Sequence, residues 1–125
     1  MATLQLNPSM TRDEIETFFE DLENNHGPAP HRVELLPGDY VSTINRDVLF
    51  SNWVTVTSAD PDNRARIAGT LQWERCQFVR VEDLHLNNPS TAQGSECLRF
   101  KDCNNMKAIN NRIEGANNGC EFFGV

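Results

Sequence analysis

A stretch that recurs further along the sequence constrains this chain more than any other feature. When residues 76–86 are aligned with residues 103–113, at an offset of 27, small or apolar side chains coincide at the first, fourth, sixth and last positions. A similar alternation links residues 54–56 to residues 79–81, at an offset of 25. Spacings of this length are typical of repeat proteins, and short alternating runs indicate strands. The sequence therefore predicts parallel strands that stack one repeat on the next.

A helical pattern precedes these strands. Thr11 and Glu14 have the spacing of a capping box, in which each side chain accepts a hydrogen bond from a backbone N–H group at the helix start. Apolar residues then recur at helical spacing, and acidic residues fill the remaining surface. We expect an amphipathic helix over residues 11–24 that caps the strands. The expected division is residues 1–30 for an N-terminal strand and this helix, and residues 31–125 for the stacked coils, within one structural domain.

Length and charge limit both the fold and the partners. A chain of 125 residues is expected to hold one domain with about four such coils. The net charge of −7 argues against nucleic acid and an anionic membrane surface as partners, because phosphate binding requires clustered Lys and Arg. The sequence has neither a long apolar run nor the pattern of a signal peptide, so we expect synthesis in the cytoplasm.

The four cysteines Cys76, Cys97, Cys103 and Cys120 lack the C-x-x-C spacing of zinc sites, and no histidine is close to them in sequence. Two disulfides, as in a secreted protein, are the alternative. We expect reduced thiols that pack as small apolar side chains, and we expect no metal and no cofactor.

Three segments together carry a wider pattern. They are the amphipathic helix at 11–24, the segment 33–40 with the sequence VELLPGDY, and the segment 109–115 with the sequence INNRIEG. They resemble the N-terminal end of a right-handed parallel β-helix of the pectate-lyase-like superfamily, and they span nearly all of the chain. The implied fold is all-β, with about four coils and an N-terminal amphipathic capping helix. A β-sandwich could use the same short strands, but the recurring offsets favour the coil.

The resemblance does not choose a function by itself. The superfamily includes polysaccharide lyases, hydrolases and epimerases as well as phage tailspikes and other virion proteins. Its enzymes use carboxylates that hold calcium, or paired carboxylic acids. Glu82 and Asp83 are the pair closest to that pattern here, but consecutive residues of a strand face opposite sides. Trp53 and Trp73 could form a sugar platform, but their alternating strands favour core packing. No catalytic residue is therefore predicted.

The last alternating segment, residues 120–125, is expected to form a strand in register with residues 98–103, at an offset of 22. An uncovered end of stacked strands exposes apolar side chains and unpaired backbone groups. Phe122, Phe123 and Val125 are therefore the candidate interface.

We expect a non-enzymatic structural protein that acts as a β-helical homo-oligomer, such as a phage capsid decoration or tail protein. A trimer is favoured from the family resemblance, and other virion proteins would then be partners and the virion its location. The alternative is the N-terminal part of a polysaccharide lyase, hydrolase or epimerase, or a carbohydrate-binding β-helix, with a polysaccharide as ligand.

Overall fold

The computed structural model describes residues 2–90 and 92–124, which form eleven strands and two helices. The helices are α1 (Arg12–Glu20) and α2 (Leu22–His26). The strands are β1 (Ala2–Leu6), β2 (His31–Leu35), β3 (Asp39–Arg46), β4 (Leu49–Ser58), β5 (Arg66–Glu74), β6 (Gln77–Glu82), β7 (His85–Asn88), β8 (Leu98–Lys101), β9 (Asn104–Ile109), β10 (Arg112–Gly115) and β11 (Cys120–Phe123).

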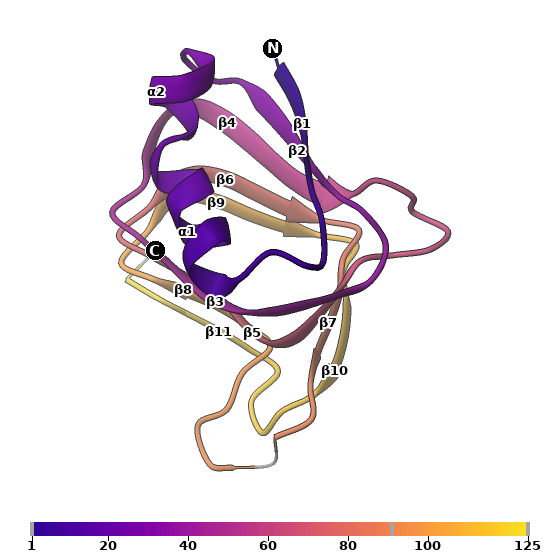
Figure 1. Cartoon of the computed structure of the whole chain (residues 1–125). Helices are drawn as coiled ribbons and strands as arrows, with labels where there is room; N and C mark the ends of the chain where they lie inside the picture. The colour runs from indigo at the N-terminus through magenta and orange to yellow at the C-terminus, as the bar shows by residue number, and fades with distance from the viewer. Residues whose placement is uncertain (1, 91, 125) are drawn as a thin grey trace.

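The described strands form two parallel sheets. One sheet has the order β1-β2-β4-β6-β9, and the other has the order β10-β7-β5-β8-β11, with β3 paired to β5. The chain passes back and forth between the sheets, so that the neighbours within a sheet are not consecutive in sequence. One of the sheets is curled into a half-barrel. In Figure 1, α1 lies in front of the area that the strands outline.

The predicted fold class, an all-β right-handed parallel β-helix of about four coils, is wrong. The architecture is α/β-like, with two parallel sheets, one of them a curled half-barrel, and with α1 packed into their common core. The resemblance to the pectate-lyase-like superfamily is wrong as well, because the described residues form no single right-handed solenoid. The physical reason is that a residue offset specifies which strands are neighbours, whereas it leaves open how the sheets curl and close.

The strand neighbours predicted from the repeat are confirmed. Val54 of β4 pairs with Val79 of β6, which is the pairing expected from the alternation shared by these two strands. Leu98 of β8 pairs with Cys120 of β11, as the last alternating segment predicted. Strands β6 and β9 pair in the register of the longest repeat. The spacing from β8 to β11 is shorter than that from β6 to β9 because the loop between β7 and β8 has nine residues and the loop between β10 and β11 has four.

Helix α1 begins where the capping box predicts. The Thr11 side chain accepts a hydrogen bond from the Glu14 N–H at 3.2 Å, and the Thr11 N–H donates to Glu14 Oε1 at 3.0 Å. Ile15 and Phe19 are buried on the apolar face of the helix. The helix predicted over 11–24 is interrupted at Asp21, which ends α1 and precedes α2. The two helices together cover one end of the core.

A single hydrophobic cluster connects the helices to both sheets. Within it, Trp73 of β5 is 0 % exposed and meets Phe19 of α1 edge to face, with 5.1 Å between the ring centroids. The N-terminal segment and the later strands thus share one core. The division into residues 1–30 and 31–125 stays a prediction within this core.

Candidate functional site

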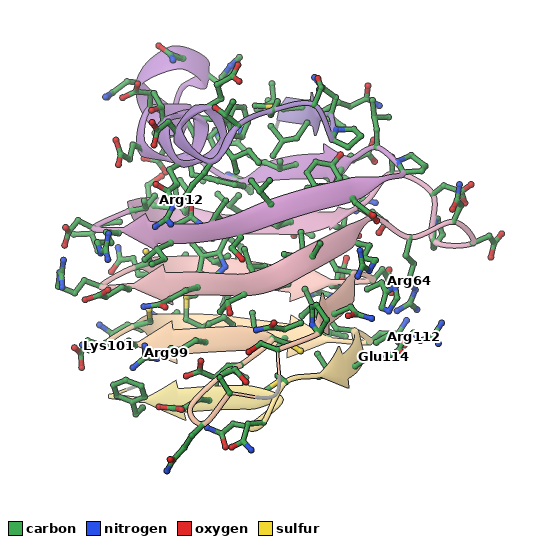
Figure 2. The ribbon with its side chains drawn as sticks, turned by 60° about the horizontal axis from the view of Figure 1, so that its bottom comes forward. Arg12, Arg64, Arg99, Lys101, Arg112 and Glu114 are labelled. Atoms are coloured by element: carbon green, nitrogen blue, oxygen red, sulfur yellow. The ribbon has the colours of Figure 1, made fainter. Side chains whose placement is uncertain are left out.

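Strands β9, β10 and β11 form an open surface at one end of the molecule, which we call the edge surface. Of the five large apolar side chains that are exposed in the described chain, three lie on it: Ile109, Ile113 and Phe122. Figure 2 shows the yellow strands of this surface at one end and the helices at the opposite end. Within the described chain, β9 pairs only with β6, β10 only with β7 and β11 only with β8. The edge surface therefore presents both apolar side chains and unpaired backbone groups.

The exposure of these side chains follows from their register. Phe122 pairs with Phe100, and Ile113 pairs with Leu86, on the preceding strands. Phe100 is 3 % exposed and Leu86 is 0 % exposed, whereas Phe122 is 50 % exposed and Ile113 is 38 % exposed. Strands β10 and β11 thus repeat the apolar positions of β7 and β8, but no described strand covers these side chains. An apolar patch of this kind is typical of an interaction surface.

The predicted interface residues do not share one face of the sheet. Phe122 stacks on Phe100, with 4.6 Å between the ring centroids and 19° between the ring planes. Phe123 points to the other side of the strand. There the guanidinium of Arg99 and the ammonium of Lys101 lie 4.8 Å and 5.8 Å from its ring centroid, and Figure 2 shows these two cations side by side. Val125 lies outside the described residues. The interface role of the three residues stays a prediction.

A hollow of about 290 Å³ opens on the edge surface. Apolar, thiol and amide side chains line it, namely Leu98, Ala108, Asn110, Asn111, Ile113, Cys120 and Phe122. Cys120 is exposed as a residue, but neighbouring atoms partly desolvate its thiol; this desolvation, followed by the neighbouring thiol of Cys97, raises the pKa of the Cys120 thiol. The thiol therefore stays protonated at neutral pH and is a poor nucleophile. The hollow can accept an apolar side chain, and its lining residues supply no acid and base pair for catalysis.

The predicted packing role of the cysteines holds for three of the four. Cys76, Cys97 and Cys103 are buried among the core side chains, as expected for small apolar residues. The expectation is wrong for Cys120, which is exposed. Cys120 pairs with Leu98 of β8, which is 0 % exposed. Cys120 is more exposed than Leu98 because β11 belongs to the edge surface, where no described strand covers it.

Two carboxyl groups and one guanidinium connect β11 to β8 beside the edge surface. Glu96 is 8 % exposed, and its Oε1 lies 3.5 Å from Arg99 Nε. Glu121 Oε1 on β11 lies 4.0 Å from the same nitrogen. Burial, followed by a hydrogen bond with Glu121, raises the pKa of Glu96, although the charge of Arg99 acts against this rise. Sequence reasoning missed the cluster because the proximity of the two acids depends on the path of the loop between β7 and β8.

Glu96→Gln should make the protein more stable at neutral pH. The pKa of Glu96 is higher in the folded protein than its ordinary value of 4.5, so ionisation of this carboxyl weakens the folded state. Its favourable contribution is present below pH 4.5 and is lost as the pH rises through the folded pKa. Glutamine keeps the shape of the side chain and cannot ionise. Thermal unfolding between about pH 4 and about pH 8 measures the difference.

Glu14→Gln is the matched control with the opposite sign. Hydrogen bonds from the backbone and then the side chain of Thr11 lower the pKa of Glu14. The contribution of this carboxylate is therefore present above pH 4.5 and is lost as the pH falls through the folded pKa. The control should lose stability at neutral pH. If Glu96→Gln lost stability there too, the ion pair with Arg99 would outweigh the cost of burial.

A second, polar hollow of about 370 Å³ lies between the loop that follows β4 and the strands β7 and β10. Glu114 Oε1 lies 2.6 Å from His85 Nε2 and forms an ion pair with Arg112, whose Nε is 2.7 Å away. Arg64 donates to the carbonyl of Asn110 at 2.7 Å, and Figure 2 shows Arg64, Arg112 and Glu114 on the same side of the molecule. The Arg64 hydrogen bond thus ties the loop after β4 to the turn before β10, and the His85–Glu114 contact ties β10 to β7. One sign of this cluster was present in the sequence, because the alignment at an offset of 27 places His85 opposite Arg112, and these residues pair in the structure.

The acidic pair singled out from the sequence does not converge on a site. Arg80 Nε donates to Glu82 Oε2 at 2.9 Å, whereas Asp83 Oδ1 accepts from Asn110 Nδ2 at 2.6 Å. The two carboxylates therefore have separate partners. Among the residues that the structure describes, no group of three or more His, Cys, Asp and Glu side chains is placed to hold a metal ion.

The two tryptophans occupy different environments. Trp73 is buried in the core, as predicted. Trp53 is only partly buried, and it meets Phe78 edge to face with 5.4 Å between the ring centroids. The ammonium of Lys107 lies 4.4 Å from the Trp53 ring centroid. A sugar ring would have to displace Lys107 in order to stack there.

Comparison with known proteins assigns no family, because no family model, curated protein or solved structure matches the chain. Over the described residues, neither helix has the length and apolar character needed to cross a membrane.

Proposed function

We propose that this protein is a non-enzymatic structural protein that assembles with further copies of itself through the edge surface. The observation that carries the proposal is the exposure of Phe122, at 50 %, beside its paired neighbour Phe100, at 3 %. Fully burying a phenylalanine side chain stabilises a protein by about 1.5–3 kcal/mol relative to leaving it exposed. A contact that covers Phe122 recovers part of that free energy.

The backbone of the edge surface supports the same proposal. Soluble proteins usually protect the edges of their sheets with proline, with charged side chains, with bulges, or with a covering helix or loop. The described segments β9, β10 and β11 contain no proline, their charged side chains are Lys107, Arg112, Glu114 and Glu121, and the two helices cover the opposite end of the molecule. The open edges can therefore pair with strands of another copy.

A catalytic function has weaker support. The hollow on the edge surface is lined by apolar, thiol and amide groups, and the carboxylates considered for catalysis are engaged with Arg80 and Asn110. No specific observation favours a polysaccharide ligand, because Lys107 covers the partly exposed Trp53. A place in a virion was implied only by the family resemblance, and it is not part of the proposal.

Light scattering of the purified protein, combined with the variant Phe122→Asp, tests the proposal. The native mass should be a multiple of 14.2 kDa. The aspartate places an unpaired charge in the contact and should weaken association by about ten-fold or more, so that the variant becomes monomeric. Its far-UV circular dichroism should stay unchanged, because the side chain is half exposed in the single copy.

Leu49→Asp provides the control for the added charge. Leu49 on β4 is 65 % exposed and lies away from the edge surface. This variant should keep the mass of the unchanged protein. A monomeric unchanged protein at high concentration, or equal effects of the two variants, would overturn the proposal.

A further inference from the structure

Cys76 and Cys103 occupy the same corner of two successive repeats, where the chain passes from one sheet to the other. Gln77 of β6 pairs with Asn104 of β9, so the two cysteines that precede them are neighbours in register. Both are buried, with exposed fractions of 1 % and 0 %. We propose that these two thiols form a redox-sensitive pair, which a hydroperoxide oxidises to a disulfide that joins the starts of β6 and β9.

The spacing of the two strands permits this bond. Neighbouring strands lie about 4.7–4.9 Å apart, which is within the range of about 4.4–6.8 Å that separates the Cα atoms of a disulfide. Register partners of parallel strands project their side chains to the same side of the sheet. The Cys76 N–H donates to Cys103 Sγ at 3.5 Å, so the Cys103 sulfur already lies against the Cys76 backbone. Only a small movement is needed to join the two sulfurs.

Packing alone does not require a thiol at this corner. Val48 occupies the equivalent position of the preceding repeat, because Leu49 pairs with Gln77. Val48 is 4 % exposed and belongs to the same hydrophobic cluster as the two cysteines. An aliphatic side chain is therefore sufficient to fill the corner. Two successive thiols add the capacity to be oxidised.

The environments of the two thiols differ, and this difference assigns their roles. A hydrogen bond from the Cys76 thiol lowers the pKa of Cys103, burial acts against this effect, and the Cys76 N–H adds to the lowering. The same contact between the thiols, followed by burial, raises the pKa of Cys76. Each sulfur also lies 3.3 Å from two backbone carbonyl oxygens, so these contacts do not distinguish them. Because the thiolate is the reactive form, Cys103 is the attacking group.

The oxidation balances in two steps. The Cys103 thiolate attacks one oxygen of the hydroperoxide, the O–O bond breaks, and the other oxygen takes a proton and leaves as an alcohol or as water. Cys103 is then a sulfenic acid. The Cys76 sulfur attacks the Cys103 sulfur, the S–S bond forms, the S–O bond breaks, and the hydroxyl group leaves as water with the Cys76 proton. The two thiols together lose two electrons, which the hydroperoxide accepts.

Strand β9 gives a small oxidant a route to the buried pair. Within the described chain, β9 pairs only with β6, and its residues are largely exposed. A strand with few buried contacts opens locally at a lower cost in free energy than a strand of the core. Brief opening of β9 therefore admits hydrogen peroxide to Cys103. The disulfide then holds β9 on β6 by closing a loop that contains β7 and β8.

Peptide mapping of the folded, unchanged protein after treatment with hydrogen peroxide tests the inference. We expect a peptide in which a disulfide links Cys76 to Cys103, and we expect reduction with dithiothreitol to restore both thiols. Cys120→Ser lacks the exposed thiol and should give the same linked peptide, with loss of two of its three remaining thiols. The inference is overturned if the unchanged protein retains the thiols of Cys76 and Cys103 while Cys120 is consumed.

Two serine variants test the order of the steps. Serine keeps a hydrogen-bond donor and cannot form a disulfide. In Cys76→Ser the sulfenic acid of Cys103 has no partner, so a 1,3-dione probe should label Cys103. In Cys103→Ser the Cys76 thiol should stay unlabelled. Equal labelling of the two variants would contradict the assigned roles. These readouts require no second copy, so the inference stands or falls independently of the proposed self-assembly.

Discussion

Replacing Trp73 by alanine should lower the free energy of unfolding by about 3–5 kcal/mol. Trp73 is 0 % exposed, and its indole meets Phe19 of α1 edge to face at 5.1 Å. The substitution removes the contact that joins the helix to β5 and leaves a cavity between the sheets, which close-packed neighbours cannot fill by small shifts. Urea unfolding followed by far-UV circular dichroism measures the loss, because this signal does not depend on tryptophan fluorescence.

Trp53→Ala is the matched control, since it deletes the same atoms at the surface. Its ring is partly exposed, with Phe78 at 5.4 Å and the ammonium of Lys107 at 4.4 Å from the ring centroid. Water can fill the space that it leaves, so the expected cost is about 1–2 kcal/mol. Equal costs for the two variants would show that Trp73 does not hold the helix and the sheets together.

The local features of the fold could be predicted because they depend on residues that are close in sequence or repeated in it. The reciprocal hydrogen bonds of Thr11 and Glu14 follow from their spacing alone. The pairing of Val54 with Val79 follows from the recurrence of one alternating pattern. Where one sheet face is buried, a shift by one residue would expose the whole apolar row, so the register is strongly specified.

The closure of the sheets could not be predicted in the same way. The offsets between repeats predict that β4 lies beside β6. This neighbour relation is the same in a single coil and in two separate sheets, so the offsets do not discriminate between these folds. Curl depends on strand twist and on how α1 fills the space between the sheets through Phe19 and Trp73. Those contacts join residues far apart in sequence, and no repeat encodes them.

Part of the geometry of the candidate site could be predicted from the sequence. Phe122 lies on the edge surface because β11 continues the pattern of β8, which the sequence shows. Side chains alternate along a strand, so the Phe123 ring lies on the opposite face from Phe122, under Arg99 and Lys101, and the interface role of both residues stays a prediction. The meeting of Glu96 with Glu121 could not be foreseen, because it depends on a loop without a periodic pattern.

Gly115→Ala should lower the free energy of unfolding by about 2–5 kcal/mol, which is the sum of two costs. Gly115 has a φ of +76°, in the left-handed region where a side chain costs about 1–2 kcal/mol. In addition, a Cβ atom there would overlap the carbonyl oxygen of Asn88, its register partner on β7. The neighbouring Ala116 N–H donates to that same carbonyl at 2.6 Å. Strand β10 can therefore relieve the overlap only by moving away from β7.

Gly94→Ala isolates the first of these costs. Gly94 has a φ of +81° in the turn closed by the hydrogen bond from Ser95 N–H to the Ala92 carbonyl, and an added Cβ would meet no atom within 4 Å. Its substitution should therefore cost about 1–2 kcal/mol, measured by the same urea unfolding. Equal losses for the two variants would mean that β10 adjusts to the methyl group freely. Because β10 carries Ile113 on the edge surface, a displaced strand should also weaken self-association. The mass of Gly115→Ala in solution should therefore fall, while that of Gly94→Ala stays unchanged.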